Sequence, residues 1–389
     1  MLTGVNVALG VTGSIAAVKV VELAHELRRR GANVRAVVSP SATGIINPWA
    51  VEFATDNPVV NEITGRVEHV ELCGREGWAD VFLVAPATAN TVGKIAAAVD
   101  DTPVTTCATT ALGADVPVVI APAMHEPMYD HPGVLDAIER VESWGVEFVS
   151  PRIEEGKAKI ATEDAIALDV ARATTPDLLD GKHVVVTSGA TSEAIDPVRI
   201  LTSRSSGKMG RAVARACYVY GANVTLVHDG PGVPYATVEE VETSAEMLDA
   251  VEGHVAGLPA DALVSVAAVS DYTVDDADEK IRSGRELSLD LHPTPKLIDT
   301  VRDDHPDLPI VGFKAETSGD DDAMVAAARE TLERANLSFV VANDASVMGD
   351  DETRTLFVRE NSVREHGGSK AELGFHVVEE LAREVTGDA

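Results

Sequence analysis

The sequence has few cysteines and few aromatic residues. Its three cysteines, Cys73, Cys107 and Cys217, are scattered and form no CxxC pair, so neither a disulfide framework nor a zinc site is predicted. We expect free thiols buried among apolar side chains. Aromatic residues make up 4% of the 389 residues and hydrophobic residues 45%, which indicates cores of Val, Ala, Leu and Ile. This length is sufficient for two domains.

Long apolar runs and a basic leader are also missing. No run reaches the length of a membrane span, and the first residues, MLTGVNVALGVTGS, are typical of a first strand and not of a signal peptide. We therefore expect a cytoplasmic protein without a membrane partner. The net charge is −31, which disfavours nucleic acid as a partner and requires salt to screen the surface. A salt-rich cytoplasm, as in extreme halophiles, is the expected setting.

Lysine is the scarcer base, with ten residues against 22 arginines. A single lysine is more often a solvated charge than a ligand contact. Seven of the ten nevertheless lie in or beside segments that resemble functional loops, and we treat them as candidates: Lys94, Lys157, Lys159, Lys208, Lys280, Lys296 and Lys314.

Short β-rich runs alternate with helical stretches along the chain. Near-continuous apolar runs suit parallel strands buried on both faces, so the predicted fold class is α/β, with two doubly wound parallel-sheet domains. Pro176 and Gly181 interrupt the pattern, and we predict domains at 1–175 and 183–389 joined by a linker at 176–182. The predicted strands are 5–11, 33–39, 81–87, 116–123, 183–189, 223–229, 262–272 and 308–317, with helices at 15–30 and 207–220.

Two segments of the first half have the character of ligand-binding loops. GVTGSIAAVK joins the first strand to the first helix, where Gly13 permits a tight turn and Ser14 can cap a helix whose free N–H groups favour a phosphate. APATANT ends a later strand with Thr88 and Asn90, at the edge where open α/β sheets bind ligands. No GxGxxG is present, which disfavours a dinucleotide-dependent dehydrogenase.

The segment SRSSGKMG, residues 203–210, opens the second half as an anion-binding strand-to-helix turn. It is not a Walker A loop, because GxxxxGK[ST] is not met. Four cations lie within thirteen residues of an otherwise acidic chain, which fits polyanionic ligands: Arg199, Arg204, Lys208 and Arg211.

These motifs, in this order, resemble a known family. GSIAAVK, EHVELCGREGWAD, APATANT and PAMHEPM are similar to the flavin-dependent cysteine decarboxylases. SGATSEAIDPVRILTSRSSGKMG, AAVSDY, EKIR, GFKAET and AND are similar to the phosphopantothenate–cysteine ligases. Nearly the whole chain therefore resembles the bifunctional coenzyme A biosynthesis family. The resemblance implies a flavodoxin-like FMN domain followed by a Rossmann-like ligase domain.

The resemblance also implies the chemistry. The ligase half would activate 4′-phosphopantothenate with a nucleoside triphosphate, usually CTP with Mg2+, and cysteine would attack the acyl-nucleotide. The decarboxylase half would use FMN to oxidise the cysteine end toward a thioaldehyde, release CO2 and return the hydride, giving 4′-phosphopantetheine. Only small-molecule substrates are implied. The expected assembly is a homo-oligomer, trimeric or dodecameric through the first domain and dimeric through the second.

Position by position, the resemblance implies catalytic roles for His69, His125 and Lys280. His125 stands where relatives have Asn, and residues 150–162 contain no cysteine where many relatives have one. The implied flavin contacts are Gly13, Ser14, Ser39, Thr43, Pro86, Thr88, Asn90, Lys94, Ala123 and Met124. The implied substrate and nucleotide contacts are Lys157, Lys159, Ser203, Arg204, Ser205, Ser206, Gly207, Lys208, Asp271, Lys296, Phe313, Lys314, Asn343 and Asp344. No metal site formed by the protein itself is predicted.

Two alternatives stay open. One is a flavin-binding regulatory protein on the same fold, which would tolerate loss of His69. The other is a different flavodoxin-type enzyme fused to a nucleotide-binding domain, in which Lys280 would have no functional role. The sequence does not decide between CTP and ATP.

Overall fold

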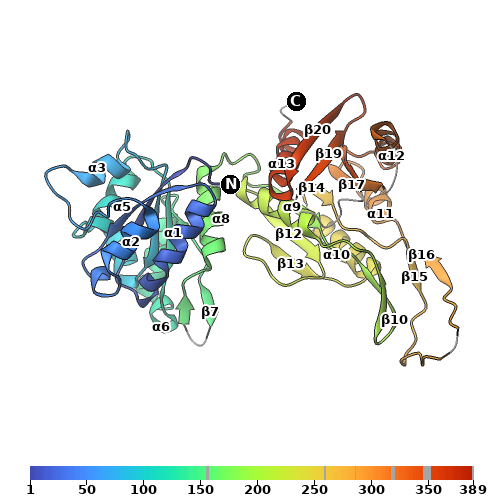
Figure 1. Cartoon of the computed structure of the whole chain (residues 1–389), viewed down its shortest axis with the longest axis horizontal. Coiled ribbons are helices and arrows are strands. Elements are labelled where there is room, and N and C mark those ends of the chain that lie inside the picture. The colour runs from blue at the N-terminus through green and yellow to red at the C-terminus, as the bar shows by residue number, and fades with distance from the viewer. Residues whose placement is uncertain (155–156, 258–259, 285, 317–319, 345–351, 388–389) are drawn as a thin grey trace. The chain divides into compact units, whose positions relative to one another are not determined.

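The computed structural model describes residues 1–154, 157–257, 260–284, 286–316, 320–344 and 352–387, and Figure 1 shows it as a cartoon. The chain forms two compact units, Met1–Thr175 and Pro176–Ala389. The segment expected as a linker packs within the second unit, because Leu179 is fully buried and its N–H donates to the carbonyl of Tyr220 at 2.8 Å.

The first unit is built on a five-stranded parallel sheet in the order β2-β1-β3-β4-β6, which is the flavodoxin-like order. Every residue of β3 is buried, as expected for a strand covered on both faces. The strands predicted from the sequence are confirmed to within two residues. They are β1 (Asn6–Val11), β2 (Asn33–Val38), β3 (Val81–Ala87) and β4 (Val118–Pro122). The edge strand β6 (Glu147–Phe148) was not predicted.

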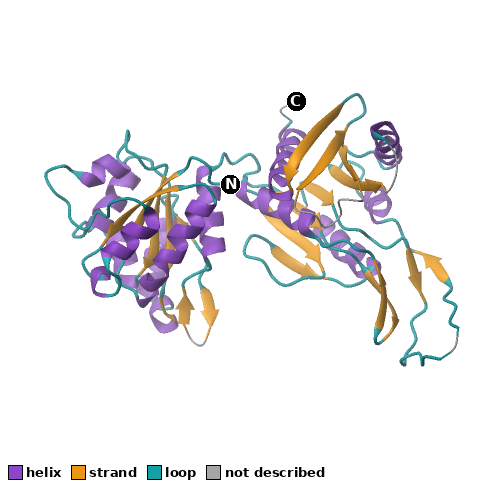
Figure 2. Ribbon diagram, viewed as in Figure 1, coloured by secondary structure: helices purple, strands orange, loops and turns teal. Residues whose placement is uncertain are grey.

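Helices cover this sheet, as Figure 2 shows. Residues 15–30 begin as a 3-10 helix, η1 (Ile15–Lys19), and continue as α1 (Val20–Arg29). Gly31 follows with φ +98° and ends the helix as predicted. The remaining helices are η2 (Ala42–Gly44), α2 (Pro48–Thr55), α3 (Glu68–Cys73), α4 (Ala89–Ala96), α5 (Pro103–Gly113), α6 (Glu126–Tyr129), α7 (Pro132–Glu142) and α8 (Glu163–Thr174).

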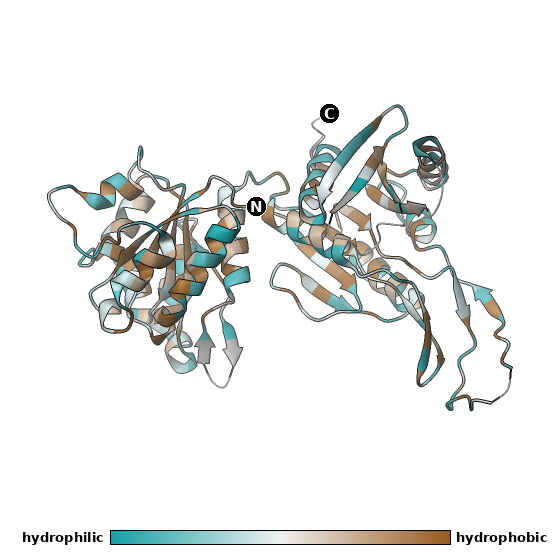
Figure 3. Ribbon diagram, in the orientation of Figure 1, coloured by the Kyte–Doolittle hydropathy of each residue, from teal (hydrophilic) through white to brown (hydrophobic). Residues whose placement is uncertain are grey.

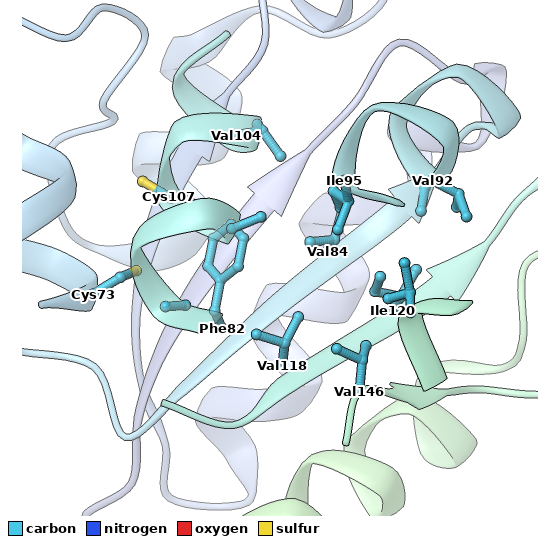
Figure 4. Packing of buried hydrophobic residues seen from close by; sticks show 14 of the residues in the cluster. Cys73, Phe82, Val84, Val92, Ile95, Val104, Cys107, Val118, Ile120 and Val146 are labelled. Carbon is cyan, nitrogen blue, oxygen red and sulfur yellow. The ribbon is translucent and has the colours of Figure 1, made fainter. Parts of the chain in front are cut away.

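One core of the first unit lies between the sheet and α3, α4, α5 and α7. Figure 4 shows Phe82 on β3 in one buried cluster with helix residues such as Ile95 and Val104 and strand residues such as Val118 and Ile120. Cys73 and Cys107 belong to this cluster, and all three cysteines are free and buried, which confirms that prediction. In Figure 3 the hydrophobic colour follows the central strands of each unit.

The second unit contains an eight-stranded sheet in the order β13-β12-β9-β14-β17-β18-β19-β20. The first six strands are parallel and have the classic Rossmann order, while β19 and β20 are antiparallel. The strands are β9 (His183–Thr187), β12 (Asn223–His228), β13 (Thr237–Glu240), β14 (Ala262–Ser265), β17 (Ile310–Glu316), β18 (Phe339–Asp344), β19 (Glu352–Val358) and β20 (Val363–Ser369). The helices are α9 (Lys208–Val219), α10 (Ser244–Gly257), α11 (Leu297–Asp304), α12 (Asp321–Arg334) and α13 (Lys370–Thr386).

Two antiparallel ribbons in this unit were not predicted from the sequence. One is β10 (Ser192–Asp196) with β11 (Arg199–Thr202), and the other is β15 (Tyr272–Val274) with β16 (Leu291–Pro293). In Figure 1 both extend away from the sheet of the second unit. The strand predicted at 262–272 ends at Ser265 because the chain turns there toward the β15–β16 ribbon.

Among the helices of the described ranges, none is long and apolar enough to cross a membrane.

We expect His228, at the end of β12, to make the stability of the second unit depend on pH. The side chain is 1% exposed, and neither ring nitrogen makes a hydrogen bond within the described part of the chain. Burial lowers its pKa, and the Arg211 cation lowers it further, while Asp229 opposes this. The unfolded chain protonates the ring near its ordinary pKa of about 6.5. The free energy of unfolding therefore falls as the pH drops from there toward the lowered pKa.

We expect His228→Leu to remove this loss of stability at acid pH. The loss is about 1.4 kcal/mol if the pKa of His228 is lowered by one. The variant replaces an orphaned buried ring with an apolar side chain, so stability near neutral pH should be retained. Denaturant unfolding of the second unit between about pH 7.5 and pH 5.5 measures the effect. His292→Leu is the control, because His292 is 55% exposed. An unchanged pH dependence in His228→Leu would contradict the prediction.

Candidate functional site

Three strand ends of the first unit are tied together at one edge of its sheet. The hydroxyl of Thr12 donates to the carbonyl of Pro86 at 2.7 Å. The hydroxyl of Ser14 donates to the carbonyl of Ala123 at 3.2 Å, and the N–H of Ala123 donates to Ala87 at 2.9 Å. These bonds join the loops after β1, β3 and β4, at the carboxyl edge where ligands bind in such sheets.

The turn after β1 approaches the loop after β2 very closely. A Cβ atom on Gly13 would lie 2.5 Å from Ser41 Oγ and 3.2 Å from the Ser41 carbonyl carbon. Ser39 Oγ lies 3.2 Å from Ser41 Oγ, and Ser14 accepts a hydrogen bond from the N–H of Ala16 at 3.3 Å, as predicted for a cap. Hydroxyls and backbone N–H groups therefore gather here in a form that suits a phosphate group.

An open, mainly apolar cavity of about 580 Å³ lies beside this turn. Apolar walls with a few placed polar groups are typical of sites for flat organic ligands, and Ile15 and Val18 on its border are 78% and 57% exposed. The cavity brings together seven of the predicted residues: Gly13, Ser14, Thr88, Ala123, Met124, His125 and Lys159. It also contains residues that were not predicted, among them Lys19, Met128, Arg152 and Ile160.

His125 enters the cavity from a small three-stranded sheet in the order β5-β8-β7. β5 (Met124–His125) pairs with β8 (Lys157–Lys159), so that His125 lies opposite Lys157, and β7 (Arg152–Glu154) pairs with the other edge of β8. Arg152 Nε donates to the carbonyl of Ile160 at 3.3 Å. Residues 152–154 and 157–159 thus form one small sheet with the strand that carries His125. The side chain of Lys157 lies outside the described residues.

Several predicted residues of the first unit lie elsewhere. His69 is half-buried on α3, does not line the cavity, and its Nδ1 atom is buried without a hydrogen-bond partner in the described structure. Lys94 forms an ion pair with Asp101 at 2.7 Å, and Asn90 is exposed on α4. Three others also lie outside the cavity lining: Ser39, Thr43 and Pro86.

In the second unit, the turn before α9 is pressed against the end of β9. Gly207 adopts φ +67°, and its carbonyl accepts a hydrogen bond from the Ser188 hydroxyl at 2.9 Å. A Cβ atom on Gly210 would lie 2.5 Å from Ser188 Cβ and 2.8 Å from Ser188 Cα. Arg211 donates to the carbonyl of Ser206 at 2.8 Å. The predicted helix start is confirmed, since α9 begins at Lys208.

A smaller cavity, of about 160 Å³, lies at this turn. It contains six predicted residues: Ser205, Ser206, Gly207, Lys208, Phe313 and Asn343. Thr355 and Lys370 also line it and were not predicted. Lys370 opens α13, where Ser369 and Glu372 form a capping box. The S-x-x-E spacing of such a box is visible in sequence, so the helix start that carries Lys370 was detectable.

The remaining predicted residues of this unit do not line the cavity. Asp271 and Lys296 form an exposed ion pair with each other, and Lys280 is exposed between β15 and β16. Lys314 lies between Phe313 and Ala315, both of which line the cavity, so it belongs to the other face of β17. Ser203 and Arg204 are exposed before the turn. The side chain of Asp344 lies outside the described residues.

Comparison with known families agrees with this architecture. Residues 1–175 match the family model described as Flavoprotein, and residues 179–385 match the DNA/pantothenate metabolism flavoprotein C-terminal domain. The chain is therefore a two-domain flavoprotein of the α/β class.

Similarity to individual proteins extends over both units. The chain is 52% identical to the Coenzyme A biosynthesis bifunctional protein CoaBC of Thermococcus kodakarensis, over 92% of this chain and 89% of that protein. It is 35% identical to the protein of the same name from Methanocaldococcus jannaschii, over 98% and 94%. For the Bacillus subtilis protein the identity is 34%, over 98% of each. The chain belongs to the family of bifunctional coenzyme A biosynthesis proteins.

We expect Gly210→Ala to destabilise the second unit by about 1–3 kcal/mol, as overpacking does. The new methyl group meets the Cβ and backbone of Ser188, so the start of α9 must move away from β9. Calorimetric unfolding measures the loss. Gly253→Ala on α10 is the matched control, because nothing lies within 4 Å of its added Cβ atom. Equal stability of the two variants would show that the close approach at Gly210 is not required.

Proposed function

We propose that the two cavities carry two consecutive steps of coenzyme A biosynthesis. The second unit joins 4′-phosphopantothenate to cysteine at the expense of a nucleoside triphosphate. The first unit then decarboxylates the product to 4′-phosphopantetheine with FMN. The observation that carries the proposal is that one chain of this family has two separate cavities, each at the carboxyl edge of a parallel sheet and each beside a glycine turn suited to phosphate.

The residues of the first cavity fit a flavin. The turn at Gly13 and Ser14, with the serines of the β2 loop, suits the FMN phosphate, and the apolar wall with Thr88, Ala123 and Met124 suits the ring system. FMN, when bound, supplies the oxidation and later reduction of the thiol-bearing end of the substrate. Four other predicted contacts are retained as part of the proposal: Thr43, Pro86, Asn90 and Lys94.

The chain's own side chains would bind and orient the substrate. His125 can donate a hydrogen bond to the substrate carboxylate, and an imidazole can also exchange a proton near neutral pH. Lys159 on β8 and Arg152 on β7, which line the cavity, would supply positive charge for the substrate's anionic groups. Lys157 is proposed for the same role, and His69 as a base.

In the second unit, the N-termini of α9 and α13 meet at one cavity and bring Lys208 and Lys370 with them. Helix N-termini and lysines stabilise phosphate groups. Phe313, Asn343 and the serines of the turn complete the cavity lining. Its volume of about 160 Å³ is below the roughly 300–1,000 Å³ of typical ligand pockets, so it would hold only part of the nucleotide.

The rest of the ligand would extend out of this cavity. We assign Lys280 to charge stabilisation during acyl transfer. Nucleotide and substrate contacts are proposed for Ser203, Arg204, Asp271, Lys296, Lys314 and Asp344. CTP with Mg2+ is the proposed nucleotide form. A homo-oligomer, trimeric or dodecameric through the first unit and dimeric through the second, remains a prediction, as does the cytoplasmic location.

The test is a mass-spectrometric assay at high salt with 4′-phosphopantothenate, cysteine, Mg2+ and either CTP or ATP. We expect 4′-phosphopantetheine, CO2 and CMP with CTP. Accumulation of phosphopantothenoylcysteine would mean that only the ligase works. Absence of both products would reject the proposal and favour a regulatory flavin-binding protein.

We expect Gly13→Ala to lower FMN affinity at least about tenfold, or ~1.4 kcal/mol. The added methyl group meets the Ser41 side chain at 2.5–2.6 Å and pushes apart the two loops that suit the phosphate. Flavin absorbance after dialysis against graded FMN measures the change. Gly93→Ala on α4 is the control, since nothing lies within 4 Å of its Cβ atom. Undiminished FMN retention in Gly13→Ala would place the phosphate elsewhere.

A further inference from the structure

A buried carboxylate in the second unit holds a segment far away in sequence. Asp196, the last residue of β10, has a side chain with no exposed surface. Its Oδ1 accepts the N–H groups of Val198 and Arg199 at 2.8 and 2.9 Å. Its Oδ2 accepts Arg199 Nη1 and, at 3.1 Å, the N–H of Ile281. Burial alone would raise the pKa of Asp196, but these donors hold it below its ordinary value.

The bond to Ile281 spans 85 residues of sequence. The same arginine completes the contact, because Arg199 Nη1 also donates to the carbonyl of Ile281 at 3.1 Å. Both polar backbone groups of Ile281 are therefore held by the Asp196–Arg199 pair. Four residues earlier, the N–H of Ala277 donates to the carbonyl of Ile195 at 3.1 Å.

Lys280 lies between these two attachment points. Asp278, Glu279 and Lys280 are exposed, and the described segment that contains them joins β15 to β16 without regular structure of its own. Ordering such a segment costs about 1–2 kcal/mol of backbone entropy per residue. The hydrogen bonds at Ala277 and Ile281 offset this loss of entropy when the protein folds, so the segment is ordered before a substrate binds.

We propose that Asp196 is a positioning residue for the ligase reaction, which fixes the backbone of Ile281 and thereby the origin of the Lys280 side chain. This rests on the proposed function, in which Lys280 stabilises acyl transfer. The Asp196 side chain has no exposed surface, so its role is to position and not to bind substrate. Its three bonds to Val198 and Arg199 shape the local turn, whereas the bond to Ile281 serves only the distant segment.

Glu193 provides a matched control on the same strand. Its side chain is also buried, at 4% exposure of the residue, and accepts the N–H of Ser244 at 3.0 Å and the hydroxyl of Thr273 at 3.1 Å. These partners lie on α10 and β15, not in the segment that holds Lys280. Glu193→Gln therefore removes an equivalent buried charge without touching the Ile281 contact.

The experiment compares Asp196→Asn, Glu193→Gln, Lys280→Gln and the Asp196→Asn/Lys280→Gln double variant in the full-length protein. Each carboxylate oxygen of Asp196 accepts two hydrogen bonds. In Asp196→Asn an NH2 group replaces one of these oxygens, so two donors lose their acceptor whichever way the amide is oriented. We expect Asp196→Asn to lower ligase kcat at least about tenfold with the nucleotide KM within about twofold, and the double variant to be no slower than Lys280→Gln. Glu193→Gln should keep kcat within about twofold. Decarboxylation by the first unit reports the amount of intact protein.

Amide hydrogen exchange supplies a readout apart from activity. We expect the Ile281 N–H to exchange at least about tenfold faster in Asp196→Asn, and unchanged in Glu193→Gln. If Asp196→Asn does not fold, Ile281→Pro removes the same N–H donor and leaves the β10 turn intact, and the same loss of kcat is expected.

The outcomes separate the two proposals. A slow Lys280→Gln enzyme with a normal Asp196→Asn enzyme would overturn the inference alone. The inference would also be overturned if the losses of ligase kcat in the two single variants added up in the double variant. An equal loss of kcat in Glu193→Gln would overturn it as well. A Lys280→Gln enzyme with full ligase rate would instead remove the role of Lys280 from the proposed function, and this inference with it.

Discussion

In both units a glycine without room for a side chain lets the chain at the start of a helix pack against a serine that follows a strand of the sheet. Gly13 lies against Ser41 in the first unit, and Gly210 lies against Ser188 in the second. A Cβ atom added at either glycine would lie 2.5 Å from a serine side-chain atom, so each glycine packs directly against that serine. This close approach leaves N–H groups and serine hydroxyls at the carboxyl edge of each sheet, and both cavities form beside it.

The chain is strongly acidic, and its buried carboxylates organise structure instead of adding to the surface charge. Asp196 and Glu193 connect β10 to segments about 50 to 85 residues away. Glu380 on α13 binds three arginines, Arg359, Arg364 and Arg383. A buried carboxylate needs several hydrogen-bond donors to compensate for its lost hydration. Each of these carboxylates therefore connects several elements of the fold. Bases are scarce, and several are engaged in such contacts.

This engagement explains which of the predicted residues lie at a cavity and which do not. Residues within a strand-to-helix turn, such as Ser14, Ser206 and Lys208, lie at their cavities because the local motif also determines their position. Lys94 and Lys296 were chosen for their proximity to motifs, but in the structure they pair with Asp101 and Asp271. Arg152 and Lys370 line the cavities and were not predicted, although the capping box before Lys370 is visible in the sequence. Proximity in sequence does not reveal which carboxylate a long flexible side chain will meet.

The sequence by itself determined the α/β class, the division into two units and the central strands, because strands buried on both faces must be continuously apolar. It also determined the glycine turns, since their backbone geometry is local. Only the tertiary structure decided which loops share a cavity, that 176–182 packs with the second unit, and that the β10–β11 and β15–β16 ribbons form. Those features depend on hydrogen bonds between residues far apart in the chain, such as Ile281 with Asp196, and neither partner carries a local signal of the other.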